Sequence, residues 1–139
     1  MTDLYDSYSQ YNIDFKIVIQ RFCFNADYTK LYLQTTKGQG SMVTAYDVND
    51  GKILKEFFQY SKKSTTVGQL SKISGMCIDR YHTQDRIYVA DWTKVNIYNH
   101  VYKFIRSFPS NDLSQDITGV QVYGNKIYLS HGHDFSVYD

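Results

Sequence analysis

A short word that occurs three times constrains the fold of this chain more than any other feature of its sequence. The apolar-Tyr-apolar triplet appears as Leu31-Tyr32-Leu33, Ile87-Tyr88-Val89 and Ile127-Tyr128-Leu129. A basic residue precedes each triplet, and a second tyrosine word follows it, centred on Tyr46, Tyr98 and Tyr138. Recurrence of this kind is the sequence signature of a repeat architecture, in which each unit packs on the next.

Each unit contains short apolar runs that are separated by turn-forming residues. Met76-Cys77-Ile78 precedes the second triplet, and the nearly alternating run from Tyr102 to Phe108 follows the second tyrosine word. A unit with four such runs reads as four antiparallel strands. The distance of about 40 residues from Tyr88 to Tyr128 is that of a propeller blade. The sequence therefore predicts an all-β fold, a partial β-propeller of about three four-stranded antiparallel blades.

The predicted organisation is an N-terminal tail over residues 1–12 and a partial propeller over residues 13–139. Within the propeller we expect an outer strand at 13–19, blade 1 at 20–59, blade 2 at 70–108 and blade 3 at 115–139. The strand at 13–19 is expected to complete the last blade of its own chain or, in a homodimer, that of the partner chain, as in propellers that close their ring with both ends of the chain. Three blades leave a ring open, and apolar end faces of that size rarely stay bare. We expect either a larger propeller or a homodimer that closes a six-bladed ring to cover them.

The second unit carries a more specific pattern. A Gly-apolar-small-apolar-Asp run ends at Asp79, an Ile-Tyr-Val-Ala-Asp run ends at Asp91, and Lys103-Phe104-Ile105 closes the unit. This order resembles an NHL repeat, whereas Ser130-His131 replaces the Ala-Asp pair in the third unit. The resemblance implies a six-bladed propeller that serves as a binding platform for proteins and sometimes RNA. Related six-bladed folds include lyases and hydrolases.

Composition and charge favour a protein partner over nucleic acid or a membrane. The chain has 15 Lys+Arg and 14 Asp+Glu, with a net charge of +1, so it offers no global field to a phosphate backbone or to anionic lipid. No run approaches the ~20 apolar residues of a membrane helix, and the acidic start of the sequence does not resemble a secretory leader. We expect a cytoplasmic protein in which Cys23 and Cys77 are reduced thiols.

The candidate chemistry is confined to His131 and His133. Side chains at i and i+2 of a strand share a face and could chelate a metal, but the same residues also fit a polar turn around Gly132. No Gly-x-Ser-x-Gly elbow and no phosphate-binding loop accompanies them. We therefore predict no enzyme activity and no cofactor. The alternative is a propeller hydrolase or lyase with a metal in the central channel, to which these histidines would contribute, and an RNA-binding module comes third.

The leading prediction is a non-enzymatic scaffold whose strand-connecting loops form a contact face for another protein. Seven loop residues are the predicted partner contacts: Lys37, Gln39, Arg80, His82, Trp92, His131 and His133.

Overall fold

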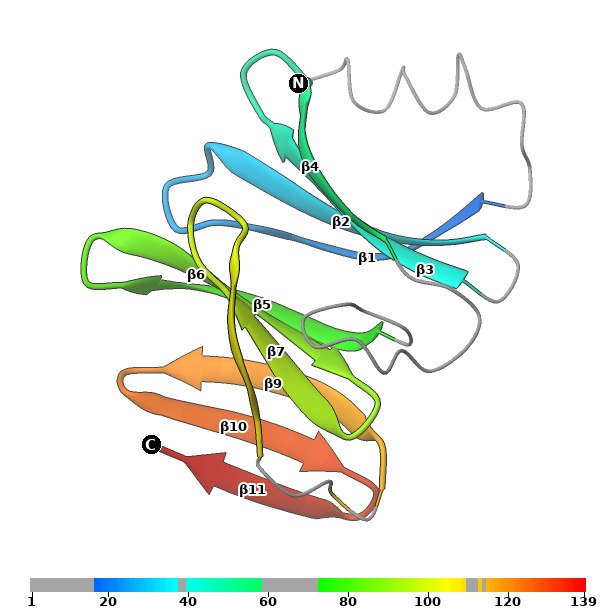
Figure 1. Ribbon diagram of the computed structural model, residues 1–139, viewed down its shortest axis with the longest axis vertical. Coiled ribbons are helices and arrows are strands. Elements are labelled where there is room, and N and C mark those ends of the chain that lie inside the picture. The colour runs from blue at the N-terminus through cyan, green and yellow to red at the C-terminus, as the bar shows by residue number, and fades with distance from the viewer. Residues whose placement is uncertain (1–16, 38–39, 59–72, 110–112, 114) are drawn as a thin grey trace.

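The computed structural model describes residues 17–37, 40–58, 73–109, 113 and 115–139, and the described chain is all-β (Figure 1). Eleven strands occur in it: β1 (Ile17–Phe24), β2 (Lys30–Lys37), β3 (Gly40–Asp47), β4 (Ile53–Phe58), β5 (Ile73–Tyr81), β6 (Gln84–Asp91), β7 (Lys94–Tyr98), β8 (Phe104–Phe108), β9 (Ile117–Tyr123), β10 (Lys126–His131) and β11 (Asp134–Tyr138). No stretch of this described part forms a helix that could span a membrane.

The strands form three antiparallel sheets in chain order. Sheet 1 has the order β1-β2-β3-β4, sheet 2 the order β5-β6-β7-β8, and sheet 3 the order β9-β10-β11. Figure 1 shows the three sheets stacked one after another along the chain. Each sheet is a meander in which every strand pairs with its neighbour in sequence. This arrangement confirms the predicted all-β fold and the partial propeller.

The expected outer strand at residues 13–19 is wrong where the structure describes it. Ile17, Val18 and Ile19 pair with Lys37, Thr36 and Thr35 of β2, so they begin the first strand of sheet 1 and do not complete sheet 3. The physical reason is that Gln20 and Arg21 form no turn, and the strand continues through them. Residues 13–16 lie outside the described residues, as does the predicted tail over 1–12.

The repeated tyrosine word marks the second strand of each sheet. Leu31, Ile87 and Ile127 pair with Tyr46, Tyr98 and Tyr138 of the third strands. Tyr32, Tyr88 and Tyr128 therefore occupy one equivalent position in the three sheets. Because side chains alternate between the two faces of a strand, these three tyrosines point to the same side of their own sheets.

The core consists of the layers between successive sheets. Tyr32, Val43 and Phe57 of sheet 1 pack against Ile87 and other residues of sheet 2. On the other face of sheet 2, Tyr88 and Ile97 pack against Ile117, Val120 and Leu129 of sheet 3. Both faces of sheet 2 are thus covered, which explains why β6 is apolar along Ile87-Tyr88-Val89-Ala90 without alternation.

Polar side chains also link sheet 1 to sheet 2. Gln34 Nε2 donates a hydrogen bond of 3.1 Å to the main-chain carbonyl of Ile73, and the guanidinium of Arg21 donates to the carbonyl of Ser74. Asn25 Nδ2 donates to Asp85 Oδ2 at 2.8 Å in a buried contact. Buried polar groups need such partners, so these bonds help to fix how the two sheets lie against each other.

Candidate functional site

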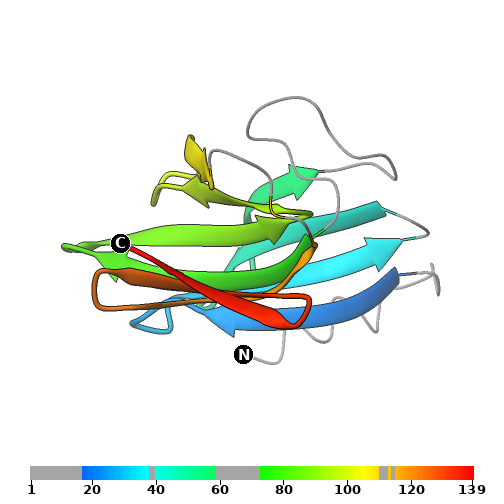
Figure 2. The same cartoon turned by 90° about the horizontal axis from the view of Figure 1, so that it is seen from below.

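The outward face of sheet 3 has no further described sheet packed on it, unlike the equivalent faces of sheets 1 and 2. Tyr32 is 0% exposed and Tyr88 is 4% exposed, because the next sheet packs over each of them. Tyr128 stands at the equivalent position of sheet 3 and is only half-buried. No described strand follows on that side, and Figure 2 shows sheet 3 nearest to the viewer.

Large apolar side chains gather on this surface, which we call the open face. It consists of Tyr123, Tyr128, Phe135 and Val137. Register places them on one side of the sheet, because Tyr128 pairs with Val137 and Ser130 pairs with Phe135. Tyr123 is 82% exposed and Phe135 is 66% exposed, and the rings of Tyr128 and Phe135 stack with their centroids 6.1 Å apart. The open face is therefore an aromatic surface that the described chain leaves uncovered.

The opposite end of the stack differs. Leu31, Leu33 and Tyr46 point away from sheet 2 and form a small cluster in which all three side chains are buried. Sheet 1 nevertheless exposes apolar side chains on the same outward face, because Phe22, which pairs with Leu33, is 63% exposed and Ile53, which pairs with Tyr46, is 55% exposed. That a larger propeller or a ring-closing homodimer covers the end faces stays a prediction.

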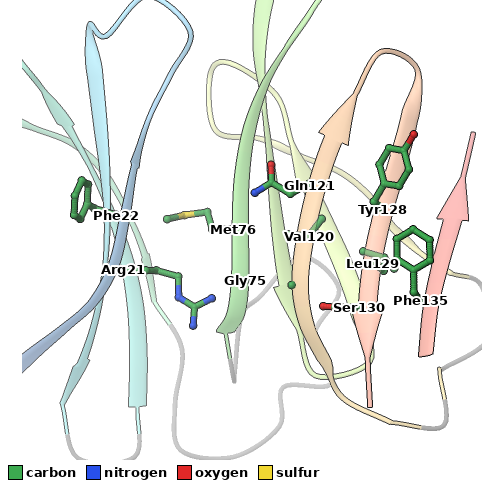
Figure 3. A pocket seen from close by; sticks show the side chains of 11 residues that line it. Arg21, Phe22, Gly75, Met76, Val120, Gln121, Tyr128, Leu129, Ser130 and Phe135 are labelled. Atoms are coloured by element: carbon green, nitrogen blue, oxygen red, sulfur yellow. The ribbon is translucent and has the colours of Figure 1, made fainter. Parts of the chain in front are cut away.

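A pocket of about 370 Å³ lies beside the first strands of the three sheets. Figure 3 shows it between the side chains of Arg21 and Met76 on one side and those of Tyr128 and Phe135 on the other. The complete lining is Arg21, Phe22, Gly75, Met76, Gly119, Val120, Gln121, Tyr128, Leu129, Ser130 and Phe135. Tyr128 and Phe135 belong to both the pocket and the open face, so the two features are continuous.

Three β-bulges shape the pocket wall. Gln20 in β1, Ser74 in β5 and Thr118 in β9 are each inserted at the same point of the first strand. A bulge re-aims the side chains that follow it, and the residues directly after these three bulges line the pocket. The approach of β5 to β9 is close there, because a Cβ added to Gly75 would lie 3.3 Å from the backbone nitrogen of Val120. Glycine at this position allows the two strands to meet.

The lining of the pocket is mostly apolar. Among the described lining residues there is no carboxylate, imidazole or thiol, so the lining supplies no group of the kinds that most often act as a general base near neutral pH. Apolar and aromatic side chains form most of the surface, and Nη1 of Arg21 donates a hydrogen bond to the carbonyl of Ser74.

The predicted metal pair does not converge. His131 ends β10 and is buried, and its Nε2 lies 2.7 Å from Ser136 Oγ. His133 is exposed in the two-residue turn to β11. Within the described ranges no group of three or more His, Cys, Asp or Glu side chains is arranged to hold a metal. The structure therefore supplies no third ligand for these histidines in the part it describes.

The predicted contact loops lie on two opposite rims of the stack. Arg80 lies near the end of β5 and His82 in the β5–β6 turn, whereas Trp92 and His133 belong to the β6–β7 and β10–β11 turns. Figure 1 shows these turns at opposite ends of their strands, because each strand crosses the whole sheet. The expectation of one contact face made by all the loops is therefore wrong. Lys37 ends β2 on the rim of Trp92, and Gln39 lies outside the described residues.

The individual loop residues have defined local roles. Arg80 forms an exposed ion pair with Asp27 at 3.2 Å. His82 and Trp92 begin two-residue turns with φ of 58° and 59°, and the carbonyl of Trp92 accepts a hydrogen bond of 2.8 Å from the main-chain N–H of Ile117. Their part in binding a partner stays a prediction.

Both cysteines are free thiols at equivalent positions of β1 and β5, Cys23 half-buried and Cys77 buried. Burial, reinforced by the neighbouring Cys77, raises the pKa of Cys23 to about 12. Burial likewise raises the pKa of Cys77. The thiolate is the reactive form of cysteine, so both side chains act as small core residues near neutral pH.

Comparisons with known proteins identify the class of the fold. A scan against known protein families found no match, and neither did a search of curated proteins. Among solved structures the chain is similar to the crystal structure of Hsv2 from Kluyvelomyces marxianus. The TM-score is 0.53 and the identity 15%, over 86% of this chain and 34% of that chain. This protein therefore spans about a third of the length of Hsv2.

Two further structures match less closely. They are BamB from Moraxella catarrhalis, with a TM-score of 0.44 and 16% identity over 78% of this chain and 40% of that chain, and the computationally designed Ika4 protein, with a TM-score of 0.42 and 12% identity over 87% and 90%. Hsv2 is a β-propeller protein, and the described sheets are blades of the same kind. At such low identity the likeness identifies the fold, and the resemblance to NHL repeats stays a prediction.

Neither the open face nor the bulges were predicted from the sequence. A signal for the bulges was present, because Ile19, Ile73 and Ile117 each precede an inserted polar residue in the first strand.

Proposed function

We propose that this protein is a non-enzymatic β-propeller scaffold that binds another protein through the open face of sheet 3. The observation that carries the proposal is the exposure of Tyr123, Phe135 and Val137 on a sheet whose preceding copies bury the equivalent face. Soluble proteins seldom leave contiguous aromatic surface bare unless it takes part in an interaction.

The composition of the open face supports a protein partner. Tyrosine and phenylalanine are enriched at protein interfaces, where a charged rim commonly surrounds an apolar centre. Lys126 and Asp139 form an ion pair of 2.5 Å at the border of the open face. The adjoining pocket would receive a partner side chain beside Phe135. The NHL-like order of the second unit points in the same direction, because that resemblance implies a binding platform.

A site-specific photocrosslinker would test this proposal. The photoreactive amino acid p-benzoylphenylalanine replaces Phe135 on the open face, and in a matched control it replaces Ile105, a 38% exposed residue of β8. In extract from the native source we expect a discrete adduct with another polypeptide from the Phe135 probe and not from the Ile105 probe. Equal labelling from both probes, or no adduct, would overturn the proposal.

The same experiment separates the proposed function from the ring-closing homodimer. An adduct at twice the mass of the chain, containing peptides of this protein alone, would show that the partner is a second copy of this protein and not a different one. An adduct that disappears after ribonuclease treatment would favour an RNA-containing assembly.

A further inference from the structure

The pocket beside the first strands has one charged side chain in its described lining, Arg21 of β1. The other lining residues are apolar, aromatic, glycine or neutral polar residues. Nη1 of Arg21 donates a hydrogen bond to the main-chain carbonyl of Ser74, and no carboxylate of the described chain forms an ion pair with this guanidinium. The positive charge at this end of the pocket is therefore not neutralised by the described residues.

The surroundings of Arg21 strengthen the attraction of its charge for an anion. The side chain is half-buried, and its Nε is buried without a hydrogen-bond partner among the described residues. A partly desolvated cation is stabilised by an anion that accepts charge-assisted hydrogen bonds from it, and water screens such a pair less than it screens an exposed pair. Since the carbonyl of Ser74 accepts a hydrogen bond from Nη1, the guanidinium is also held in one orientation.

Two glycines keep side chains out of the middle of the pocket, where β5 approaches β9. Gly75 and Gly119 both line the pocket, and a Cβ on Gly75 would lie 3.3 Å from the backbone nitrogen of Val120. A Cβ on Gly119 would lie 2.9 Å from Ser130 Oγ. The main chain therefore forms this part of the surface, and a planar group can lie against it.

Apolar side chains stand on both sides of this middle part. Met76 of β5 is half-buried on the side of Arg21, and Tyr128 and Phe135 stand on the other side (Figure 3). A thioether and aromatic rings make favourable contacts with a further ring. The volume of about 370 Å³ is at the lower end of the range for small-molecule sites, so the pocket suits a small molecule.

We propose that this pocket binds a small aromatic carboxylate, with the carboxylate group at Arg21 and the ring over the two glycines beside Met76. A positive group without an acidic residue in the described lining favours an anion over a cation, and the apolar walls favour an aromatic anion over an inorganic one. The inference goes beyond the proposed function. Arg21, Gly75 and Met76 belong to sheets 1 and 2, which pack on each other inside the described stack, away from the open face (Figure 3).

Titration with cinnamate, a planar aromatic carboxylate, tests the proposal on the intact chain with isotope-labelled methionine methyl groups. We expect a saturable shift of the Met76 methyl signal in the NMR spectrum, with half-saturation below about 1 mM, because the ring of the ligand lies beside it. Met42 of β3 lies outside the pocket lining and is the internal control, so its signal should not move. Met42→Leu identifies the two signals. Cinnamamide has the same shape without the charge and should bind at least about fivefold more weakly.

Variants of Arg21 test whether its charge selects the carboxylate. Arg21→Gln should abolish the preference for cinnamate over cinnamamide, and Arg21→Lys should keep part of it. The matched control is Arg106→Gln, at an exposed arginine of β8 outside the pocket lining, which should leave the preference unchanged.

Three results would each overturn the proposal. They are equal binding of cinnamate and cinnamamide to the natural protein, equal shifts of the Met76 and Met42 signals, and an unchanged preference in Arg21→Gln. The titration of the natural protein involves no substitution, so it decides the matter even if Arg21→Gln does not fold.

Discussion

The side-chain amide of Gln34, in the middle of sheet 1, donates a hydrogen bond of 3.1 Å to the main-chain carbonyl of Ile73 at the start of sheet 2. Gln34 is buried, and the carbonyl belongs to the last residue before the Ser74 bulge. One side chain thus joins the second strand of one blade to the irregular first strand of the next.

Removing this link should weaken the contact between the first two blades. In Gln34→Leu, the carbonyl of Ile73 is left buried without its donor, and a loss of about 1–3 kcal/mol in the free energy of unfolding is expected. Urea denaturation followed by circular dichroism measures it. The matched control is Gln20→Leu, since Gln20 is exposed and its Nε2 donates a hydrogen bond of 3.3 Å to Thr36 Oγ1; this change should alter the free energy of unfolding by no more than about 0.5 kcal/mol. Equal losses in the free energy of unfolding of both variants would show that the hydrogen bond from Gln34 to Ile73 does not stabilise the fold.

Equivalent tyrosines should differ sharply in their contribution to stability. Tyr88→Ala leaves a cavity between sheets 2 and 3 and should cost about 3–5 kcal/mol. Tyr128→Ala removes a half-buried ring from the open face, and a cost of about 1 kcal/mol or less is expected. Thermal and urea unfolding of the two variants provide the comparison. A large loss for Tyr128→Ala would mean that the open face is covered in solution.

Alanine substitutions at two turn glycines distinguish the cost of a left-handed backbone from the cost of a steric contact. Gly124 and Gly132 have φ of 63° and 59°, so alanine should cost about 1–2 kcal/mol at either position. A Cβ on Gly124 meets nothing within 4 Å, whereas one on Gly132 would lie 1.3 Å from Oε1 of Gln115. Only the flexible end of the exposed Gln115 side chain would be met, so Gly132→Ala should be slightly more destabilising than Gly124→Ala, and adding Gln115→Ala should remove the difference. Chemical denaturation of the three variants checks the order, and a reversed order would contradict the described turn.

Alkaline pH should destabilise the fold through its buried thiols. Burial raises the pKa of Cys23 to about 12 from its ordinary 9.0. Above pH 9 the unfolded chain therefore binds fewer protons than the folded chain, and the free energy of unfolding falls as pH rises from about 9 towards 12. Urea titrations between pH 8 and 10.5 should show a shallower fall for Cys23→Ala, each curve being compared with its own value at pH 8. Parallel curves for the variant and the natural protein would contradict the predicted linkage.

Local patterns in the sequence were sufficient to predict the sheets. Tyr32, Tyr88 and Tyr128 identify equivalent second strands because pairing with the following strand depends on nearby residues and short turns. Residues 17–19 were assigned to another sheet because alternation shows that a strand exists but not which strand it pairs with. The inserted residues Gln20 and Ser74 shift by one position the side chains that face the core. The pattern of apolar and polar residues in the sequence gives no sign of this shift.

The candidate site was harder to predict from the sequence than the sheets were, for a physical reason. The bond from Gln34 to Ile73 and the pocket between Met76 and Phe135 depend on how two sheets lie against each other, and no spacing along the chain encodes that distance. Loop residues such as His82 and Trp92 were predicted to share a surface, yet the length of β6 places them on opposite rims.

Both ends of the stack expose apolar side chains, Phe22 and Ile53 on the outward face of sheet 1 and Tyr123 and Phe135 on that of sheet 3. If two molecules met through their third sheets, that contact alone would close on itself as a pair. Each molecule of the pair would then turn the exposed side chains of sheet 1 outward, where they offer a second contact surface to further copies.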